Sequence, residues 1–272
     1  IPFRLLVHLS VTEIHELACY GCVMLREVRF HKDVTKIGRY SFQRCSNLER
    51  IELPEGLLRL EDLAFCGCTS LREVLIPASV RFMGDEVFDG CTSLERVVFA
   101  PRTTSIELGH HMFSSCTNLR SVTFPQNLRS IPRRCFGGCT SLINIRIPLS
   151  VEVIEKDAFS GSAIQSLVML ENVHQIHWAA FRDCLFLKKV TFHSTTLNFA
   201  NNIFSNCPSL TIIMIAPWLW PKLFASMNRH PEFMFKFFRQ YQTQIFDFEI
   251  VNADVEGEGE GTLQHNTDVN NK

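Results

Sequence analysis

Cysteine and histidine residues offer the most direct route to chemistry in this chain. Cys19-Tyr-Gly-Cys22 is its one Cys-x-x-Cys pair, a spacing that suits half of a zinc site or a redox dithiol. No second pair of cysteines or histidines follows at a matching spacing, and both cysteines fall on positions that recur along the chain. We therefore interpret the pair as structural, and a redox protein that uses Cys19 and Cys22 remains a third hypothesis for the function.

The histidine motifs also favour a structural interpretation. His174 and His177 would share one face only in a helix, whereas the surrounding pattern indicates a strand and a turn. His110 and His111 lie in a longer loop, where we expect them to be solvated. The chain has no phosphate-cradling glycine loop, no Gly-x-Ser-x-Gly and no His-Glu-x-x-His. We predict a protein that is not an enzyme, with no catalytic residue, no metal and no cofactor.

Eight of the eleven cysteines occupy one position of a repeating unit. They are Cys22, Cys45, Cys68, Cys91, Cys116, Cys139, Cys184 and Cys207. Equivalent residues of stacked coils lie about 4.8 Å apart, which alone does not forbid disulfides, but stacked side chains point the same way. Ser162 takes this position in one copy. We predict a ladder of buried thiols in a reducing compartment, with Cys66 and Cys135 as further buried thiols.

The repeating unit is about 23 residues long. Residues 65–80 are a clean copy, and their leading aromatic recurs at Phe42, Phe65, Phe88, Phe113, Phe136, Phe159, Phe181 and Phe204. Each unit contains a Leu-x-x-Val-x-Ile set that ends in the alternation of a half-buried strand, and a proline often ends it. A unit this short must stack on its neighbours. We predict a leucine-rich-repeat-like solenoid, mainly β with short helical turns.

Three regions are predicted from the extent of the repeat. Residues 1–217 form the solenoid, with about nine repeats. Residues 218–246 form a helical C-terminal cap, with a first helix from residue 218 and a second over 231–244, because an open solenoid end needs covering. Residues 247–272 are polar and acidic, and we expect them to be disordered.

The motif Phe-x-x-Cys-x-x-Leu-x-x-Val-x-Ile-Pro, followed by Ser/Ala-Val, resembles the BspA-type leucine-rich repeat family. Residues 65–80 and 136–151 fit it almost position for position, and the resemblance extends from about residue 4 to 217. It implies a curved solenoid of parallel strands and a function in binding or adhesion, with no catalytic residues to carry over. Members of the family occur in bacterial surface antigens and in expanded sets of proteins of single-celled eukaryotes.

The outward side of the long strands is the candidate binding surface. Side chains alternate along a strand, so the residue between the two buried apolar positions points outward. This partner column consists of Arg29, Glu52, Leu75, Val98, Thr123, Arg146, Val168 and Thr191, and continues to Met214. Its middle is partly apolar and its neighbours are polar, which is typical of a protein-binding patch.

The composition narrows the class of partner. A formal net charge of -1 argues against nucleic acid, whose binders usually carry a basic surplus. No apolar run reaches the roughly 18 residues of a membrane-spanning helix. We predict an unidentified protein partner bound by a cytoplasmic scaffold. The alternative is an extracellular or cell-surface adhesion protein of the BspA-like type, with a signal preceding Ile1. The aromatic cap is a further candidate docking element.

Overall fold

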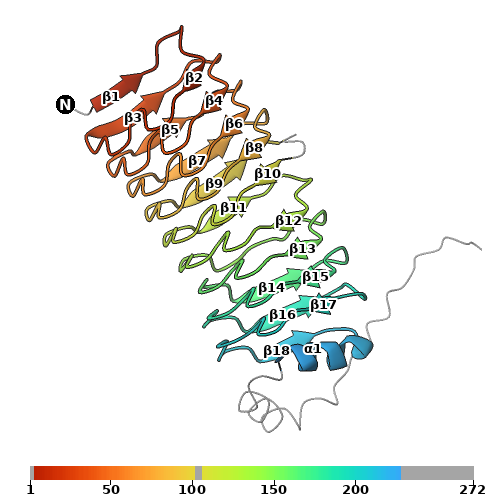
Figure 1. The fold of residues 1–272 in the computed structure, drawn as a ribbon. Coiled ribbons are helices and arrows are strands. Elements are labelled where there is room, and N and C mark those ends of the chain that lie inside the picture. The colour runs from red at the N-terminus through yellow and green to blue at the C-terminus, as the bar shows by residue number, and fades with distance from the viewer. Residues whose placement is uncertain (1–2, 102–105, 228–272) are drawn as a thin grey trace, which may run out of the picture.

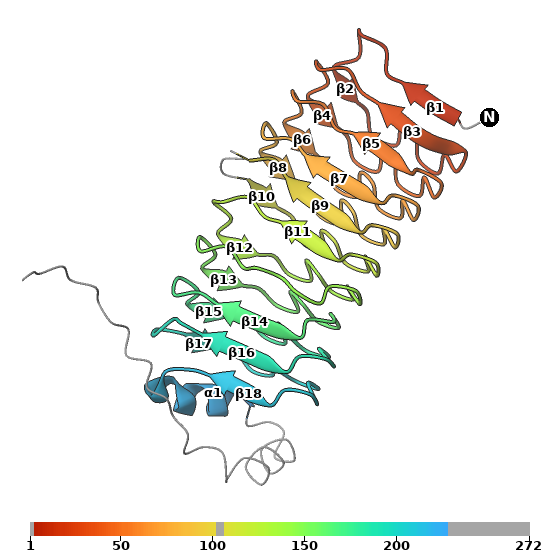
Figure 2. The ribbon, with the colours of Figure 1, turned by 180° about the vertical axis from the view of Figure 1, so that it is seen from behind.

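The computed structural model describes residues 3–101 and 106–227. These residues coil into a leucine-rich-repeat-like parallel β-solenoid of about nine turns (Figure 1). Each regular coil places one long strand on one side of the solenoid and one short strand on the other. Figure 2 shows the same stack from behind. The predicted fold class is confirmed.

The strands fall into two sets by length. The long strands are β1 (Phe3–Leu6), β3 (Leu25–Arg29), β5 (Arg50–Glu52), β7 (Glu73–Ile76), β9 (Arg96–Phe99), β11 (Ser121–Thr123), β14 (Ser166–Met169), β16 (Lys189–Phe192) and β18 (Ile212–Met214). The short strands are β2 (Glu13–Ile14), β4 (Lys36–Ile37), β6 (Arg59–Leu60), β8 (Phe82–Met83), β10 (Glu107–Leu108), β12 (Ser130–Ile131), β13 (Val153–Ile154), β15 (Gln175–Ile176) and β17 (Asn198–Phe199).

Strand pairing is parallel throughout the described residues. The long strands form the ladders β1-β3-β5, β7-β9-β11 and β14-β16-β18, and the short strands form β2-β4-β6-β8-β10 and β12-β13-β15-β17. Residues 142–147 lie between β11 and β14 without the regular ladder of a strand. Arg146, which we expected on a long strand, therefore lies in an irregular segment. The next coil has one residue fewer after Phe159. This shortened stretch lies beside the irregular segment.

Each coil makes a tight turn before its long strand, and in most coils this turn holds two residues at positive φ. In the coil of Phe65 they are Leu63, at 54°, and Gly67, at 71°. The N–H of Phe65 donates to the carbonyl of Val87 in the next coil at 3.0 Å, whereas the N–H of Cys66 donates back to Leu63 at 3.2 Å. Among the described residues, thirteen other than glycine have positive φ, which costs roughly 1–2 kcal/mol each. Coil-to-coil hydrogen bonds hold these residues in place.

A column of phenylalanine rings runs through the core between the two sides. Rings of successive coils stack with their centroids 5.2–5.8 Å apart and their planes within 25° of parallel. The stack consists of Phe42, Phe65, Phe88, Phe113, Phe136, Phe159, Phe181 and Phe204. Buried Leu, Val, Ile and Met side chains from both sets of strands surround it, so the apolar residues of every unit contribute to one continuous core.

The C-terminal end of the stack is covered by a short 3-10 helix, η1 (Pro217–Leu219), and by α1 (Trp220–Met227). Leu219 and Leu223 are buried against the last coil. The N–H of Asn202 donates to the carbonyl of Ser226 at 3.0 Å, where the equivalent N–H of other coils finds an acceptor in the following coil. The helix thus takes the place of a further coil, as expected of a cap. The predicted helix 231–244 and the tail 247–272 lie outside the described residues.

Candidate functional site

The structure places the partner column on the outward side of the long strands. Strand register aligns Arg29 with Glu52, Leu75 with Val98 and Thr123, and Val168 with Thr191 and Met214. Leu75 is 53% exposed and Val168 48% exposed, although both are strand-forming aliphatic residues. Arg146 is also exposed, but on the irregular segment. We call the surface formed by this column and the outward positions beside it the long-strand face.

The N-terminal half of this face, residues 25–99, carries charges of alternating sign. Each coil presents an adjacent pair whose order reverses in the next coil, namely Arg26-Glu27, Glu49-Arg50, Arg72-Glu73 and Glu95-Arg96. Opposite charges therefore meet between coils: Arg26 and Glu49 lie 3.0 Å apart, and Glu73 and Arg96 lie 3.6 Å apart. The hydrogen bond from Arg29 lowers the pKa of Glu27. Sequence analysis missed this alternation, which becomes visible only when the coils are aligned in register.

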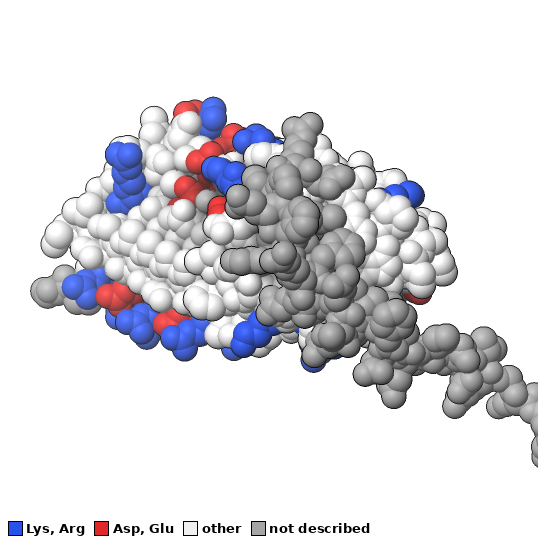
Figure 3. Space-filling model, turned by 90° about the horizontal axis from the view of Figure 1, so that it is seen from below, with Lys and Arg blue, Asp and Glu red and all other residues white. Residues whose placement is uncertain are grey.

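The C-terminal half of the face, residues 119–214, has the same backbone positions but different side chains. Its outward columns carry Arg120, Arg146, Lys188 and Lys189 and no acidic residue. Within the described part of the chain, none of these four cations forms an ion pair. Beside them lie the exposed aliphatic side chains of Ile143, Val168, Ile212 and Met214. Figure 3, viewed from below, shows charged side chains gathered in rows with mostly uncharged surface between them.

Comparisons with known proteins agree with this architecture. The family model described as the BspA type leucine rich repeat region, with six copies, matches residues 12–109 and 102–211. The chain belongs to this family. No curated protein matches the sequence significantly.

Several solved structures resemble this BspA-type repeat chain, among them two bacterial leucine-rich repeat proteins. A leucine-rich repeat protein from Bacteroides ovatus is 29% identical, with a TM-score of 0.70 over 77% of this chain and 54% of that one. The chain thus spans about half the length of that protein. A leucine rich cell surface protein from Faecalibacterium prausnitzii is 24% identical, with a TM-score of 0.56 over 78% of this chain and 69% of that one, which shows a shared fold.

The cysteine position of the BspA-type unit has a structural use. Cys45, Cys68, Cys91, Cys116, Cys139, Cys184 and Cys207 are fully buried. Each of these thiols donates to a backbone carbonyl of an earlier coil at 3.0–3.2 Å, in most cases that of the stacked phenylalanine. Burial raises the pKa of Cys45 to about 12. The cysteines are free thiols, and the ladder ties the turn of one coil to the next.

Two predictions for individual cysteines are wrong. Cys22 was expected in the buried ladder but is exposed, because no coil precedes it among the described residues to offer a carbonyl and cover the thiol. Cys66 is only half-buried, whereas Cys135 is buried. Cys19, which takes the phenylalanine position of the first coil, is half-buried, and burial raises its pKa to about 11.

The histidine motifs lie as follows. Strand β15 runs between His174 and His177, so these two imidazoles do not share a helix face. His110 Nδ1 lies 3.6 Å from Glu155 Oε2, and burial lowers the pKa of His111. Over residues 3–101 and 106–227, no group of three or more His, Cys, Asp and Glu side chains could hold a metal ion. The helices of this same part are all too short or too polar to cross a membrane.

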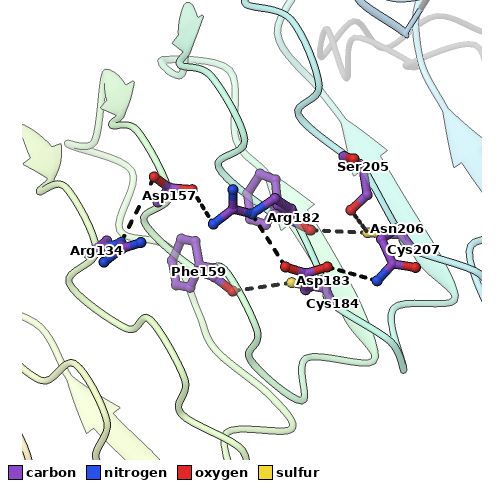
Figure 4. Close-up of polar contacts among 10 residues, drawn as sticks. Arg134, Asp157, Phe159, Arg182, Asp183, Cys184, Ser205, Asn206 and Cys207 are labelled. Atoms are coloured by element: carbon purple, nitrogen blue, oxygen red, sulfur yellow. Dashed lines mark hydrogen bonds and ion pairs between the residues drawn. The ribbon is translucent and has the colours of Figure 1, made fainter. Parts of the chain in front are cut away.

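A buried ion network that sequence analysis missed crosses the turns of the later coils (Figure 4). The side chain of Asp157 is only 3% exposed and lies between two arginines, with Oδ1 3.3 Å from Arg182 Nη2 and Oδ2 3.9 Å from Arg134 Nε. Arg182 also pairs with Asp183 at 3.3 Å, and Asp183 accepts a hydrogen bond from Asn206 at 2.7 Å. The network joins successive turns, so we assign it to stability.

Proposed function

We propose that this chain is a non-catalytic scaffold that binds a protein partner on the long-strand face. The observation that carries the proposal is the registered, outward column of aliphatic side chains, in which Leu75 and Val168 are exposed and Val98 is half-buried. When a partner covers exposed aliphatic side chains, the free energy of the complex is lowered by roughly 25 cal/mol per Å² of apolar surface buried. Because they lie in the middle of a polar and charged surface, the arrangement has the apolar centre and polar rim of a protein interface.

The rigidity of the solenoid supports this use. The face is backed by the phenylalanine stack, the cysteine ladder and the coil-to-coil hydrogen bonds of the turns. A surface that is already ordered loses little conformational freedom when a partner docks, so more of the contact free energy remains as affinity.

The C-terminal half of the face is the stronger anchor for a partner. In the N-terminal half, five arginines and five glutamates of the outward columns oppose one another, and a partner would have to replace contacts that already exist. In the C-terminal half, Arg120, Arg146, Lys188 and Lys189 have no counter-charge within the described residues and flank exposed aliphatic groups. We therefore expect a partner with acidic and apolar side chains.

The proposal has two versions, which differ in whether the protein is cytoplasmic or extracellular. The comparisons give no support to a cytoplasmic location, and an extracellular or cell-surface adhesion protein agrees with the family and with the description of the Faecalibacterium relative as a cell surface protein. We propose the extracellular version as the better supported one; in it, burial of the ladder cysteines rather than a reducing compartment keeps their thiols free. Labelling intact producing cells with a membrane-impermeant biotin reagent separates the two, because only a surface-located chain is labelled before lysis.

Affinity capture with matched variants tests the proposed face. One variant carries Leu75→Glu, Val98→Glu and Val168→Glu. The control carries Leu58→Glu, Leu149→Glu and Leu185→Glu, which lie outside the face and whose native side chains are 45–53% exposed. With circular dichroism showing both to be folded, proteins captured by the wild type and the control should be lost from the first variant. Equal capture by all three would contradict the proposal.

A further inference from the structure

The C-terminal half of the long-strand face lacks negative charge, and the chain contains a segment of complementary chemistry. Residues 246–256 read Phe-Asp-Phe-Glu-Ile-Val-Asn-Ala-Asp-Val-Glu, with four carboxylates interleaved with aromatic and aliphatic residues. No Lys or Arg occurs from residue 240 to 271. The segment therefore offers carboxylates to unpaired cations and apolar groups to exposed aliphatic side chains. We propose that residues 246–256 bind the C-terminal half of the face within the same chain.

The cations that would receive the segment lie on three of the four coils from β11 to β16. Lys188 and Lys189 are adjacent in sequence at the start of β16, and both are exposed. Val168 and Met214 occupy the coils on either side of Thr191, with which both are in register. This places apolar contacts and positive charges within one patch that a short peptide can cover.

The path of the chain brings the segment within reach. The described chain ends at Met227 in α1, which packs beside β17 in the last coil. Eighteen residues separate Met227 from Phe246, and a chain of that length can span up to about 60 Å. From β18 to β11 the face extends over four coil spacings of about 4.8 Å, or roughly 20 Å. The tether is therefore long enough to reach every cation of the patch.

Tethering makes even a weak contact effective. A tethered segment meets its site at an effective concentration on the order of 1 mM. If the segment binds the face with a Kd of about 0.1 mM, it would then be bound about nine-tenths of the time. We call this bound state closure. Closure would occupy the patch that the proposed partner needs, so a partner would bind by displacing the segment. High salt would weaken closure, because the charges are near the surface and are screened.

Zero-length carbodiimide cross-linking of the dilute full-length chain tests this directly. The reagent joins a carboxylate to a lysine amine in contact with it, and mass spectrometry identifies the joined residues. We expect Lys188 or Lys189 to be joined to Asp247, Glu249, Asp254 or Glu256. The ion pair between Lys36 and Glu61, which lie 3.9 Å apart, is the internal control for the chemistry.

Lysine acetylation rates give a second readout. In a variant with Asp247→Asn, Glu249→Gln, Asp254→Asn and Glu256→Gln, we expect Lys188 and Lys189 to react about tenfold faster than in the wild type, since nine-tenths closure protects them tenfold. The rate of Lys36 should not change. A matched variant with Glu258→Gln, Glu260→Gln and Asp268→Asn should keep the slow rate.

Three results would overturn the proposal. The first is the absence of these cross-links while Lys36 and Glu61 are joined. The second is an equal acetylation rate in the wild type and the four-site variant. The third is that cross-links in a mixture of light and isotope-labelled chains join different molecules. Neither readout requires an external partner, so failure here and failure of the proposed function are distinguishable.

Discussion

The two halves of the long-strand face share a backbone and a core but use their outward positions differently. In the N-terminal half, the reversed order of Arg26-Glu27 and Glu49-Arg50 places opposite charges next to each other from coil to coil. In the C-terminal half, the equivalent positions hold Lys188 and Lys189, which form no ion pair with any of the described residues. The core uses the same pattern of apolar residues in both halves. The solvent-facing positions carry alternating charges in one half and cations without acidic residues in the other. We therefore propose that binding specificity in this solenoid belongs to positions that do not determine the fold.

The largest expected effect tests whether the two halves have equivalent cores. Phe65→Ala in the N-terminal half and Phe159→Ala in the C-terminal half remove rings that stack in the same way, with neighbouring centroids 5.2–5.7 Å apart. Each should lower the free energy of unfolding by about 4 kcal/mol, measured by urea denaturation. A difference above about 1.5 kcal/mol between the two would show that the cores are not equivalent.

The next effect concerns the buried ion network of the later coils. Asp157→Asn keeps the size of the side chain and suits positive φ, but leaves Arg134 and Arg182 without the charge between them. We expect a loss of about 3 kcal/mol in the free energy of unfolding. Arg26→Gln, which breaks an exposed ion pair of the first coils, should cost no more than about 0.5 kcal/mol. Equal costs in urea denaturation would contradict the assignment of the network to stability.

Thiol reactivity separates the first coil from those that follow. Burial and the hydrogen bond to a carbonyl keep ladder thiols such as Cys68 and Cys91 protonated, so iodoacetamide at pH 8 should alkylate Cys22 first. Burial raises the pKa of Cys45 in the folded state to about 12, above its ordinary value of 9.0. Between these values the folded state holds a proton that the unfolded state releases, so stability falls as pH rises from 9 towards 12. Alkylation of Cys68 as fast as Cys22 would contradict the ladder.

The smallest effect distinguishes the roles of charge in the two halves. Arg50→Gln with Arg96→Gln removes counter-charges from the alternating columns and should destabilise by about 0.5–1 kcal/mol, less at high salt. In a chain that already carries Asp247→Asn, Glu249→Gln, Asp254→Asn and Glu256→Gln, so that the proposed segment no longer binds, Lys188→Gln with Lys189→Gln removes cations that have no described counter-charge and should leave stability nearly unchanged. Thermal unfolding at low and high salt checks both. Destabilisation by the lysine pair equal to that by the arginine pair would remove the distinction.

The sequence predicts the parts of this fold that depend on burial. Phe65, Cys68, Leu71 and Val74 are all fully buried, because a repeating unit must repeat its buried side chains. The end of the same pattern led us to expect a helix from residue 218, and η1 begins at Pro217. Residues at an end of the stack are less predictable: Cys22 has the ladder position but lacks the neighbouring coil that would bury it.

The surface features depend on register between distant residues. Arg134 and Asp157 are one coil apart, as are Asp157 and Arg182, and a one-residue change in coil length decides whether such side chains meet. The alternating charges were present in the sequence but acquire meaning only when Arg26 is placed beside Glu49. Arg146 was expected on a strand but lies in an irregular segment, although the shorter coil after Phe159 can be read from the sequence.

The measurement that tests the account most directly is affinity capture with variants confined to one half of the face. Leu75→Glu with Val98→Glu alters the N-terminal half, and Val168→Glu with Met214→Glu alters the C-terminal half. We predict that partners captured by the wild-type chain are lost from the C-terminal variant and largely kept by the N-terminal variant, with both variants folded by circular dichroism. Full capture by both variants, or a greater loss from the N-terminal one, would contradict the account.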